Sequence, residues 1–244
     1  MRLVIDIGNT RTKIAVFSGR TMFFVKAFER IGIADIKNII NQFPTIKKVI
    51  FSSVSFIDKD KEEIKEFLGQ RFRFIEMNND LILPITNHYL TPITLGCDRI
   101  AGVIGANSLF PENNCLVIDA GSCITLDLID KFGNYYGGSI SAGINMKYKA
   151  LNTFTDSLPL IEGKFKEENI VGNDTQSSIR SGIINGTVME LEGFIAYYMN
   201  KYTDLKILFT GGDAHYLHSY FKENTILEEH LVLSGLNIIL DTNA

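Results

Sequence analysis

A short pattern that occurs twice is the feature of this chain that most restricts its fold. The first copy reads Val4-Ile5-Asp6-Ile7-Gly8-Asn9-Thr10, and the second reads Val117-Ile118-Asp119-Ala120-Gly121-Ser122-Cys123. In each copy an apolar run leads to an Asp and a turn that contains a glycine, and a second strand-like segment follows, over 12–17 and 124–129. The pattern predicts a strand, a tight turn and a strand in both places.

Two unrelated hairpins would carry the same short pattern. The shared Asp argues against that reading, because Asp is a poor strand residue whereas a carboxylate at a strand end suits chemistry. The expected elements around each copy also follow one order. Strands are expected over Thr21–Phe28, Lys47–Val54, Arg71–Met77, Cys115–Ala120, Cys123–Asp130, Tyr135–Ile140 and Lys206–Thr210, and helices over Ala34–Phe43, Lys59–Leu68, Asp98–Leu109, Asn145–Phe154 and Thr175–Asn200. We therefore expect an α/β protein made of two βββαβα-type halves, with an irregular stretch over 78–96.

Composition narrows the class of ligand. The chain has 244 residues, 45% of them hydrophobic, and a formal charge of −4, which gives no basic surface for nucleic acid. No apolar run approaches the roughly 18 residues of a membrane-spanning helix, and Asp6 interrupts the apolar segment that a signal peptide would need. We therefore expect a cytoplasmic protein that binds a small molecule and neither nucleic acid nor membrane.

Cysteine and histidine give no sign of a metal centre. Cys97, Cys115 and Cys123 form no CxxC pair and are expected to be buried, reduced thiols. His215 and His218 can share a helix face, but no third ligand lies near them in the sequence.

The sequence contains neither a P-loop nor a glycine-rich dinucleotide fingerprint. Two Asp-x-Gly hairpins offer another way to bind phosphate, since turn N–H groups hold the phosphates while carboxylates hold the accompanying cation. Asp6 and Asp119 would then face one cleft. Lys13 follows the first turn and would reach the transferred phosphoryl group, although a solvated strand lysine fits the sequence equally well.

Two further glycine turns carry charged residues. In Gly96-Cys97-Asp98-Arg99, Asp98 stands where a helix is expected to begin, so it is either an acid that stabilises the helix start or the acceptor of a substrate proton. Arg99 would then bind a substrate carboxylate. Gly211-Gly212-Asp213 follows an apolar strand, where it would admit a flat base or form an ordinary turn.

Small residues recur every four positions in the expected long helix, at Ser178, Gly182 and Gly186. Such a stripe allows close approach of another helix, either within the chain or in a dimer.

Taken together, these residues resemble the type III pantothenate kinases, within the superfamily of actin, sugar kinases and acetate kinase. The resemblance covers nearly the whole chain and rests on an ordered set: 6–13, 96–99, 119–122, 137–138, 173–175 with Gly182, and 211–214. It implies a duplicated ribonuclease H-like (actin-like ATPase) fold with an interdomain cleft, an N-terminal half over 1–110 and a C-terminal half over 111–244. It also implies ATP-dependent phosphorylation of pantothenate, the first step of coenzyme A biosynthesis.

The resemblance also implies roles for single residues. The ATP-binding residues would be Asp6, Ile7, Gly8, Asn9, Thr10, Arg11, Thr12 and Lys13, with Ser122 where the family often has threonine. The pantothenate-binding residues would be Tyr89, Gly96, Cys97, Asp98, Arg99 and Thr175, with Asp98 as proton acceptor and Thr175 acting in the site of the neighbouring subunit. A homodimer follows from that last role. Asp119 would bind a monovalent cation such as K⁺ or NH₄⁺, and Mg²⁺ would accompany ATP.

One position departs from the family pattern, because Ala142 stands where proline is common, which leaves the local turn less rigid. Two rival functions remain open at this point. The first is a kinase of the same superfamily with another substrate, and the second is a nucleotide-binding regulatory protein without turnover.

Overall fold

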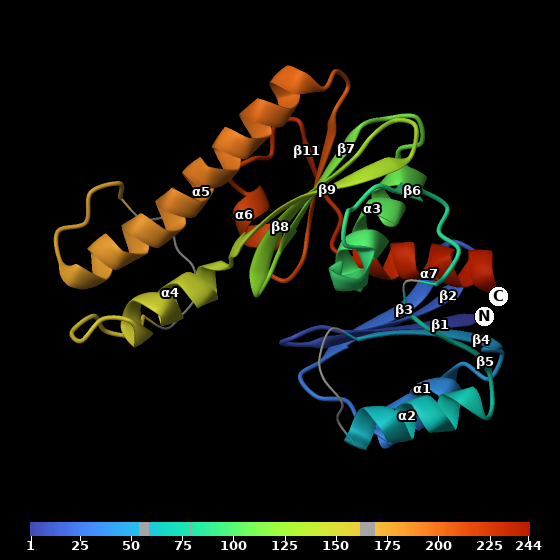
Figure 1. Cartoon of the computed structure of the whole chain (residues 1–244). Helices are drawn as coiled ribbons and strands as arrows, with labels where there is room; N and C mark the ends of the chain where they lie inside the picture. Colours follow the sequence, from blue (N-terminus) through green and yellow to red (C-terminus); the bar gives the residue numbers. More distant parts are fainter. Residues whose placement is uncertain (54–58, 79, 162–168) are drawn as a thin grey trace. The chain divides into compact units, whose positions relative to one another are not determined.

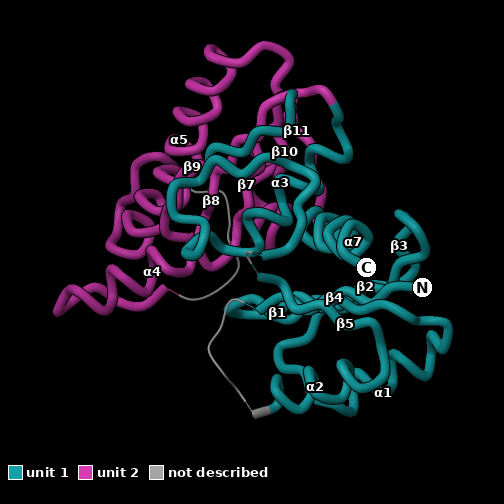
Figure 2. Tube along the Cα trace, turned by 45° about the vertical axis from the view of Figure 1, so that its right-hand side comes forward, with its two compact units in different colours: residues 1–111, 132–136, 230–244 teal, residues 112–131, 137–229 magenta. Residues whose placement is uncertain are grey.

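The structure is a computed structural model that describes residues 1–53, 59–78, 80–161 and 169–244. Contacts within the chain divide it into two compact units (Figure 2). Unit 1 comprises residues 1–111, 132–136 and 230–244, and unit 2 comprises residues 112–131 and 137–229. The proposed boundary between duplicated halves, at residue 110, stays a prediction.

Unit 1 contains a five-stranded sheet with the strand order β3-β2-β1-β4-β5. Its elements are β1 (Arg2–Ile7), β2 (Thr12–Ser18), β3 (Thr21–Phe28), α1 (Ile33–Gln42), β4 (Lys48–Ser53), α2 (Lys59–Gly69), β5 (Arg73–Glu76), β6 (Thr86–Asn87), a 3₁₀ helix (Pro92–Thr94), α3 (Cys97–Leu109) and α7 (Leu231–Asn243). Strand β1 is antiparallel to β2 and parallel to β4, and β4 is parallel to β5. Helices therefore make the crossovers that parallel strands require.

Alternation along the strands decides which face of this sheet meets α1 and α2. Leu3, Ile5 and Ile7 of β1 point to one face and join a buried cluster with Ile36 of α1 and Ile64 of α2. Helices α3 and α7 pack against each other, and both also contact the sheet of unit 1. In Figure 1, α1 and α2 lie on one side of β1 and α7 lies on the other.

Unit 2 repeats this topology. Its elements are β7 (Cys115–Ala120), β8 (Cys123–Ile129), β9 (Asn134–Ala142, of which 134–136 belong to unit 1), α4 (Ile144–Thr153), α5 (Thr175–Lys201), β10 (Lys206–Thr210), α6 (Ala214–His218) and β11 (Thr225–Leu227). The strand order β9-β8-β7-β10-β11 corresponds one to one to β3-β2-β1-β4-β5. Strand β7 is antiparallel to β8 and parallel to β10, as β1 is to β2 and β4. The prediction of a duplicated α/β fold is thus confirmed.

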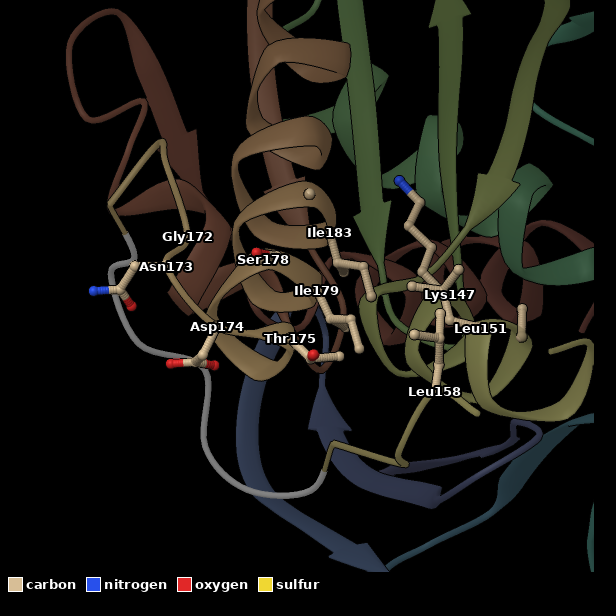
Figure 3. Close-up of a pocket in the computed structure, with 12 residues that line it drawn as sticks. Lys147, Leu151, Leu158, Gly172, Asn173, Asp174, Thr175, Ser178, Ile179 and Ile183 are labelled. Atoms are coloured by element: carbon tan, nitrogen blue, oxygen red, sulfur yellow. The ribbon is translucent and has the colours of Figure 1, made fainter. Parts of the chain in front are cut away.

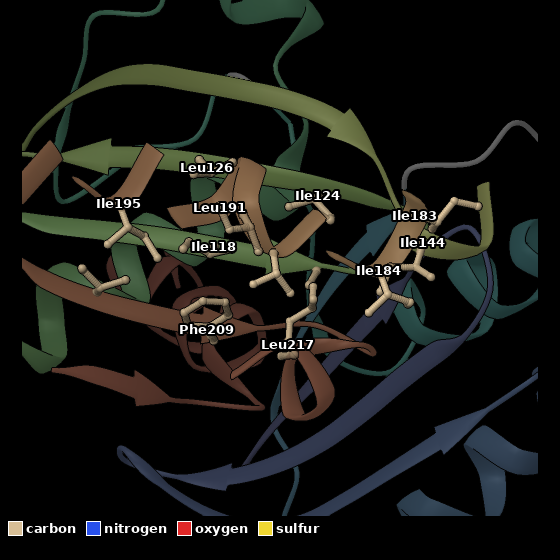
Figure 4. Packing of buried hydrophobic residues seen from close by; sticks show 14 of the residues in the cluster. Ile118, Ile124, Leu126, Ile144, Ile183, Ile184, Leu191, Ile195, Phe209 and Leu217 are labelled. Carbon is tan, nitrogen blue, oxygen red and sulfur yellow. The ribbon is translucent and has the colours of Figure 1, made fainter. Parts of the chain in front are cut away.

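The core of unit 2 lies between its sheet and α4, α5 and α6. Ile118 of β7, Leu126 of β8 and Phe209 of β10 meet Leu191 of α5 and Leu217 of α6 in one buried cluster (Figure 4). Burying aliphatic and aromatic side chains of this kind is the main favourable term in folding. The cluster fixes the strand ends from which the site residues of unit 2 extend.

Most expected elements are found within one or two residues of their predicted ends. Two elements were missed, the strand β11 and the helix α7, and the stretch over 78–96 contains the short strand β6 and the 3₁₀ helix. Val54, at the end of the strand expected over Lys47–Val54, and Asn79, in the expected irregular stretch, lie outside the described residues. Among the described residues, no helix is both long and apolar enough to cross a membrane.

Candidate functional site

Asp6 stands near the end of β1, between two strands. It is paired in register with Lys13 of antiparallel β2 and with Ser52 of parallel β4. Cross-strand neighbours of opposite charge attract each other, so Lys13 is a partner of Asp6 and not an isolated solvated lysine. Lys13 is half-buried, and Ser52 is fully buried.

The environment of Asp6 disfavours its charged form. Burial raises the pKa of Asp6 most, the nearby Asp98 carboxylate raises it further, and Lys13 and the Ser52 hydroxyl lower it, which leaves the pKa at about 6. Asp6 is surrounded by protein on most sides but keeps some contact with solvent. The Ser52 hydroxyl makes no hydrogen bond of good geometry within the described residues, so its effect on Asp6 is that of a nearby dipole. A bound cation or phosphate group would change this balance directly.

The turn after Asp6 closes tightly. The N–H of Gly8 donates to the carbonyl of Arg11 at 3.1 Å, and a Cβ on Gly8 would lie only 3.2 Å from that oxygen. Asn9, Thr10 and Arg11 are exposed at the tip. An exposed turn that presents amide, hydroxyl and guanidinium groups is suited to binding phosphate oxygens.

Asp98 lies in the first turn of α3, whose N-cap is Gly96. Its Oδ1 accepts a hydrogen bond from the N–H of Arg99 at 2.9 Å, and no side chain caps this helix. A Cβ on Gly96 would meet Asp98 Oδ1, so another residue at this position would displace the Asp98 carboxylate. Asp98 is therefore a first-turn acid favoured by the helix dipole, and its closeness to Asp6 also makes it part of a two-carboxylate group.

Arg99 and Tyr89 approach each other from different segments of unit 1. The Arg99 guanidinium lies 5.5 Å from the centre of the Tyr89 ring, and Arg99 is buried. Tyr89 stacks on Tyr135 with ring centroids 6.4 Å apart, and its N–H donates to Asn87 Oδ1 at 2.9 Å. These contacts hold an aromatic ring beside a cation, an arrangement that suits a ligand with a carboxylate and an apolar body.

Cys97, the first residue of α3, lies near the Asp98 and Asp6 carboxylates but is not set up as a nucleophile. Burial raises the pKa of its thiol most, the Asp98 and Asp6 carboxylates raise it further, and the pKa reaches about 11. The thiolate is the reactive form of cysteine, so at neutral pH this side chain acts as a small neutral group. All three cysteines are free, as expected, although only Cys115 is fully buried.

In unit 2, two other glycine-containing segments lie against the second Asp-x-Gly turn: the turn at 211–213 and Gly143, which precedes α4. Asp119 pairs in register with Thr210 of β10, and the N–H of Asp213 donates to the carbonyl of Ala120 at 2.8 Å. Gly211 has a φ of +101°, and a Cβ there would collide with the Asp119 carboxylate and the Ala120 carbonyl. The turn at 211–213 thus lies directly against Asp119.

Ser122 is held from another side by the start of α4. The N–H of Gly143 donates to the carbonyl of Ser122 at 3.1 Å, and a Cβ on Gly143 would collide with the carbonyls of Gly121 and Ser122. The Gly121 N–H closes the turn by donating to the Cys123 carbonyl at 2.8 Å. The side chain of Ser122 is half-exposed.

Thr175, the first residue of α5, is exposed and lines a cavity of about 940 Å³ between α4 and α5. Figure 3 shows Ile179 and Ile183 of α5 facing Leu151 and Leu158 across it. Asp174 caps α5 by accepting from the Ser177 N–H at 2.9 Å.

The small-residue stripe of α5 is not used for close packing within the described chain. Gly182 and Gly186 are exposed, and a Cβ on either would have no described atom within 4 Å. Of the two expected uses of this stripe, close packing within the chain is therefore not observed, and a dimer contact remains a prediction.

The sequence predictions did not include Ser52 and Thr210, which occupy equivalent places in the two units. Each is buried and pairs with the Asp of its own unit from a parallel neighbouring strand. The repeat itself contained the signal, because the fourth strand of each half ends in a hydroxyl-bearing residue. No group of three or more His, Cys, Asp or Glu suited to hold a metal ion occurs in the described ranges.

Comparison with known proteins gives one family. A model of the family described as type III pantothenate kinase matches residues 2–197. The protein named Type III pantothenate kinase from Christiangramia forsetii is 42% identical over 244 residues, which cover 100% of this chain and 99% of the relative. The protein of the same name from Phocaeicola vulgatus is 37% identical over 243 residues, with 100% and 99% covered.

Solved structures agree on the fold. A protein from Campylobacter jejuni, described as a Baf family transcriptional activator, has a TM-score of 0.61 at 23% identity, with 99% of this chain and 98% of that chain covered. A glucokinase from an Antarctic psychrotroph has a TM-score of 0.53 at 12% identity, with 98% of each chain covered. At such identities the likeness concerns the fold alone.

Proposed function

The chain belongs to the type III pantothenate kinase family, and we propose that it transfers the γ-phosphoryl group of ATP to pantothenate, with Asp98 accepting the proton. The hydroxyl oxygen of pantothenate forms the new bond to the γ-phosphorus, and the bond from that phosphorus to the bridging oxygen of ADP breaks. The hydroxyl proton passes to the Asp98 carboxylate. The products are 4′-phosphopantothenate and ADP, and the reaction belongs to coenzyme A biosynthesis.

The observation that supports this role best is the proximity of the Asp98 carboxylate to the Asp6 carboxylate. The two carboxylates come from α3 and β1, and the charge of Asp98 raises the pKa of Asp6. Two carboxyl groups that share one site but have different surroundings differ in pKa. Such a pair is typical of a site in which one carboxylate binds a cation and the other accepts a proton. Because phosphoryl transfer has a loose transition state, positioning and charge stabilisation contribute more than base strength.

For pantothenate, the proposed binding residues are Tyr89 and 96–99. The Arg99 guanidinium is a planar double donor that matches the substrate carboxylate, and the Tyr89 ring beside it supports contact with the apolar part of the substrate. Cys97, with its raised pKa, would act there as a neutral side chain.

For ATP, the proposed phosphate-binding residues are 6–13 and Ser122. The exposed turn at 9–11 supports contact with phosphate oxygens, and Lys13, held beside Asp6, supports contact with the transferred group. Kinases use ATP together with a divalent metal ion, which neutralises the charge that develops on the phosphates. The Asp6 carboxylate, with the Asp98 carboxylate near it, fits such an ion because carboxylate oxygens are the ligands that Mg²⁺ prefers.

Asp119 is proposed to hold a monovalent cation, K⁺ or NH₄⁺. Its carboxylate lies directly against the backbone of Gly211, because glycine has no side chain to separate the two. Hard cations take oxygen ligands, and a carboxylate beside turn carbonyls meets that requirement. We further propose a homodimer in which Thr175 reaches the pantothenate site of the other subunit, since Thr175 and the stripe of Ser178, Gly182 and Gly186 are exposed along α5.

The test is pantothenate-dependent release of ADP by the purified chain with ATP and Mg²⁺, with and without K⁺. We expect turnover that requires pantothenate and increases with K⁺. Turnover with another alcohol but not with pantothenate would favour a different kinase of the superfamily, and ATP binding without turnover would favour a regulatory protein. Light scattering at several concentrations tests the dimer.

A further inference from the structure

Lys147 of α4 and Glu190 of α5 form a partly buried ion pair in unit 2, outside the proposed site. The Lys147 ammonium lies 2.7 Å from Glu190 Oε2 and 2.9 Å from Thr187 Oγ1, and the two charged side chains are only 22% and 29% exposed. Thr187 donates its own proton to the Ile183 carbonyl at 2.7 Å, so its oxygen accepts from Lys147. Burial raises the pKa of Glu190, but hydrogen bonds from Lys147 and Ser141 outweigh it and lower the pKa overall.

These contacts lie on both sides of Gly143. Ser141 is near the end of β9 and Lys147 is in the first turns of α4, and both bind the same carboxylate on α5. Between them, the buried Gly143 donates its N–H to the Ser122 carbonyl at 3.1 Å, and its carbonyl accepts from the Lys147 N–H at 2.9 Å. Glu190 therefore binds the chain on both sides of Gly143, the residue whose N–H supports the Ser122 turn.

The rest of α4 is held by apolar packing, because Ile144 and Tyr148 are buried in one cluster with Leu191 of α5, and the ion pair adds a polar restraint to that packing. One side of α4 faces the cavity between α4 and α5, which Leu151 and Leu158 line opposite Ile179. Figure 3 shows the Lys147 side chain extending away from Leu151 and Leu158, and its ammonium binds Thr187 and Glu190 of α5. A half-buried, hydrogen-bonded ion pair contributes more than an exposed one, because removal of one partner leaves the other charge without compensation.

We infer that Glu190 and Lys147 are positioning residues, whose ion pair fixes Gly143 and through it the Ser122 turn for nucleotide binding. Neither side chain touches the nucleotide in this scheme. The inference rests on the proposed contact of Ser122 with ATP, and it concerns the same reaction. It assigns a catalytic consequence to a contact between two helices.

The test compares Glu190→Gln with wild type in two measurements. In the ligand-free protein, hydrogen exchange of the Gly143 amide should be roughly five- to tenfold faster, because the loss of one such ion pair is worth about 1 kcal/mol. In the kinase assay, KM for ATP should rise by a similar factor while KM for pantothenate changes by less than about twofold. Lys147→Arg, which keeps the charge, should stay near wild type in both measurements.

Glu76→Gln is the matched control, because it removes an ion pair with Lys65 in unit 1, at 2.5 Å, and should change neither quantity. If Glu190→Gln does not fold, Ser141→Ala replaces it, because this variant removes one hydrogen bond to the same carboxylate. The same two measurements on Ser141→Ala then test the inference. Unchanged exchange at Gly143 in a folded variant would overturn the inference. Ser122→Ala separates the proposed contact of Ser122 with ATP from the role of Glu190. A normal KM for ATP in Ser122→Ala refutes that contact. The exchange rate of the Gly143 amide in Glu190→Gln still decides whether Glu190 fixes the turn.

Discussion

The guanidinium of Arg99 lies 5.5 Å from the centre of the Tyr89 ring, within the range of a cation–π contact. Arg99 is only 8% exposed, so its charge is poorly solvated. Arg99→Leu should raise KM for pantothenate roughly 10- to 100-fold and change kcat little, because a carboxylate contact acts on the ground state and the transition state alike. Steady-state kinetics with varied pantothenate measure this.

Arg71→Leu is the control for that variant. Arg71 lies 4.2 Å from the Phe67 ring on the surface of α2, so the substitution removes a similar contact away from the site. Arg99→Lys keeps the charge but loses the two parallel donors and should fall between wild type and Arg99→Leu. An unchanged KM in both Arg99 variants would remove this residue from the pantothenate site.

Asp98→Asn should lower kcat by roughly 10²- to 10⁴-fold, since the amide cannot accept the hydroxyl proton. Its effect on stability should be small, because Asp98 is not the N-cap of α3. Asp60→Asn removes the corresponding first-turn acid of α2 and controls for the helix dipole. Equal kcat values for Asp98→Asn and Asp60→Asn would end the proton-acceptor proposal.

Asp6 predicts a pH dependence of stability in the ligand-free protein. Its pKa in the folded chain, about 6, is higher than the ordinary value, so folding favours the protonated form. That contribution is complete below about pH 4 and is lost as the pH rises through 6. Asp6→Asn should therefore be more stable than wild type at pH 7.5, by up to about 3 kcal/mol, and equally stable at pH 4.

Urea unfolding of both proteins across this range gives the difference curve. Asp98→Asn removes the neighbouring charge, so it should shift the curve to lower pH by lowering the pKa of Asp6. A difference between wild type and Asp6→Asn that does not vary between pH 4 and pH 7.5 would contradict the assigned environment of Asp6.

Much of the fold was accessible from the sequence because it is repeated. The two Val-Ile-Asp-x-Gly segments predicted two hairpins, and the structure contains both, each with a parallel strand beside the Asp. The pairing of Asp6 with Lys13 is set by the register of the first hairpin, and the sequence predicted that hairpin but not this pair. Their grouping with Asp98 did not follow from the spacing, because it depends on where α3 begins relative to the sheet of unit 1.

Helix α7 was missed for a physical reason. Its segment, 231–243, is apolar on most sides, so it lacks the one-sided pattern that identifies a surface helix. It is buried because α3 and the sheet of unit 1 both pack on it, and that contact joins residues at opposite ends of the chain. Arg2 strengthens it by binding Asp241 and Asn237. A local reading of the sequence contains no signal for such a contact.

The packing of α7 on α3 leads to a prediction about catalysis at a distance. A Cβ on Gly235 of α7 would collide with the carbonyl of Ala101, one turn after Asp98 in α3. Gly235→Ala should therefore destabilise the protein by about 1–3 kcal/mol through overpacking. It should also lower kcat, because α3 must move and carries the proton acceptor with it. Gly69→Ala, at an open position at the end of α2, should be neutral or stabilising by up to about 1 kcal/mol. Thermal unfolding together with kcat for both variants checks the prediction, and a Gly235→Ala protein as stable and active as wild type would show that the α3–α7 contact is looser than described.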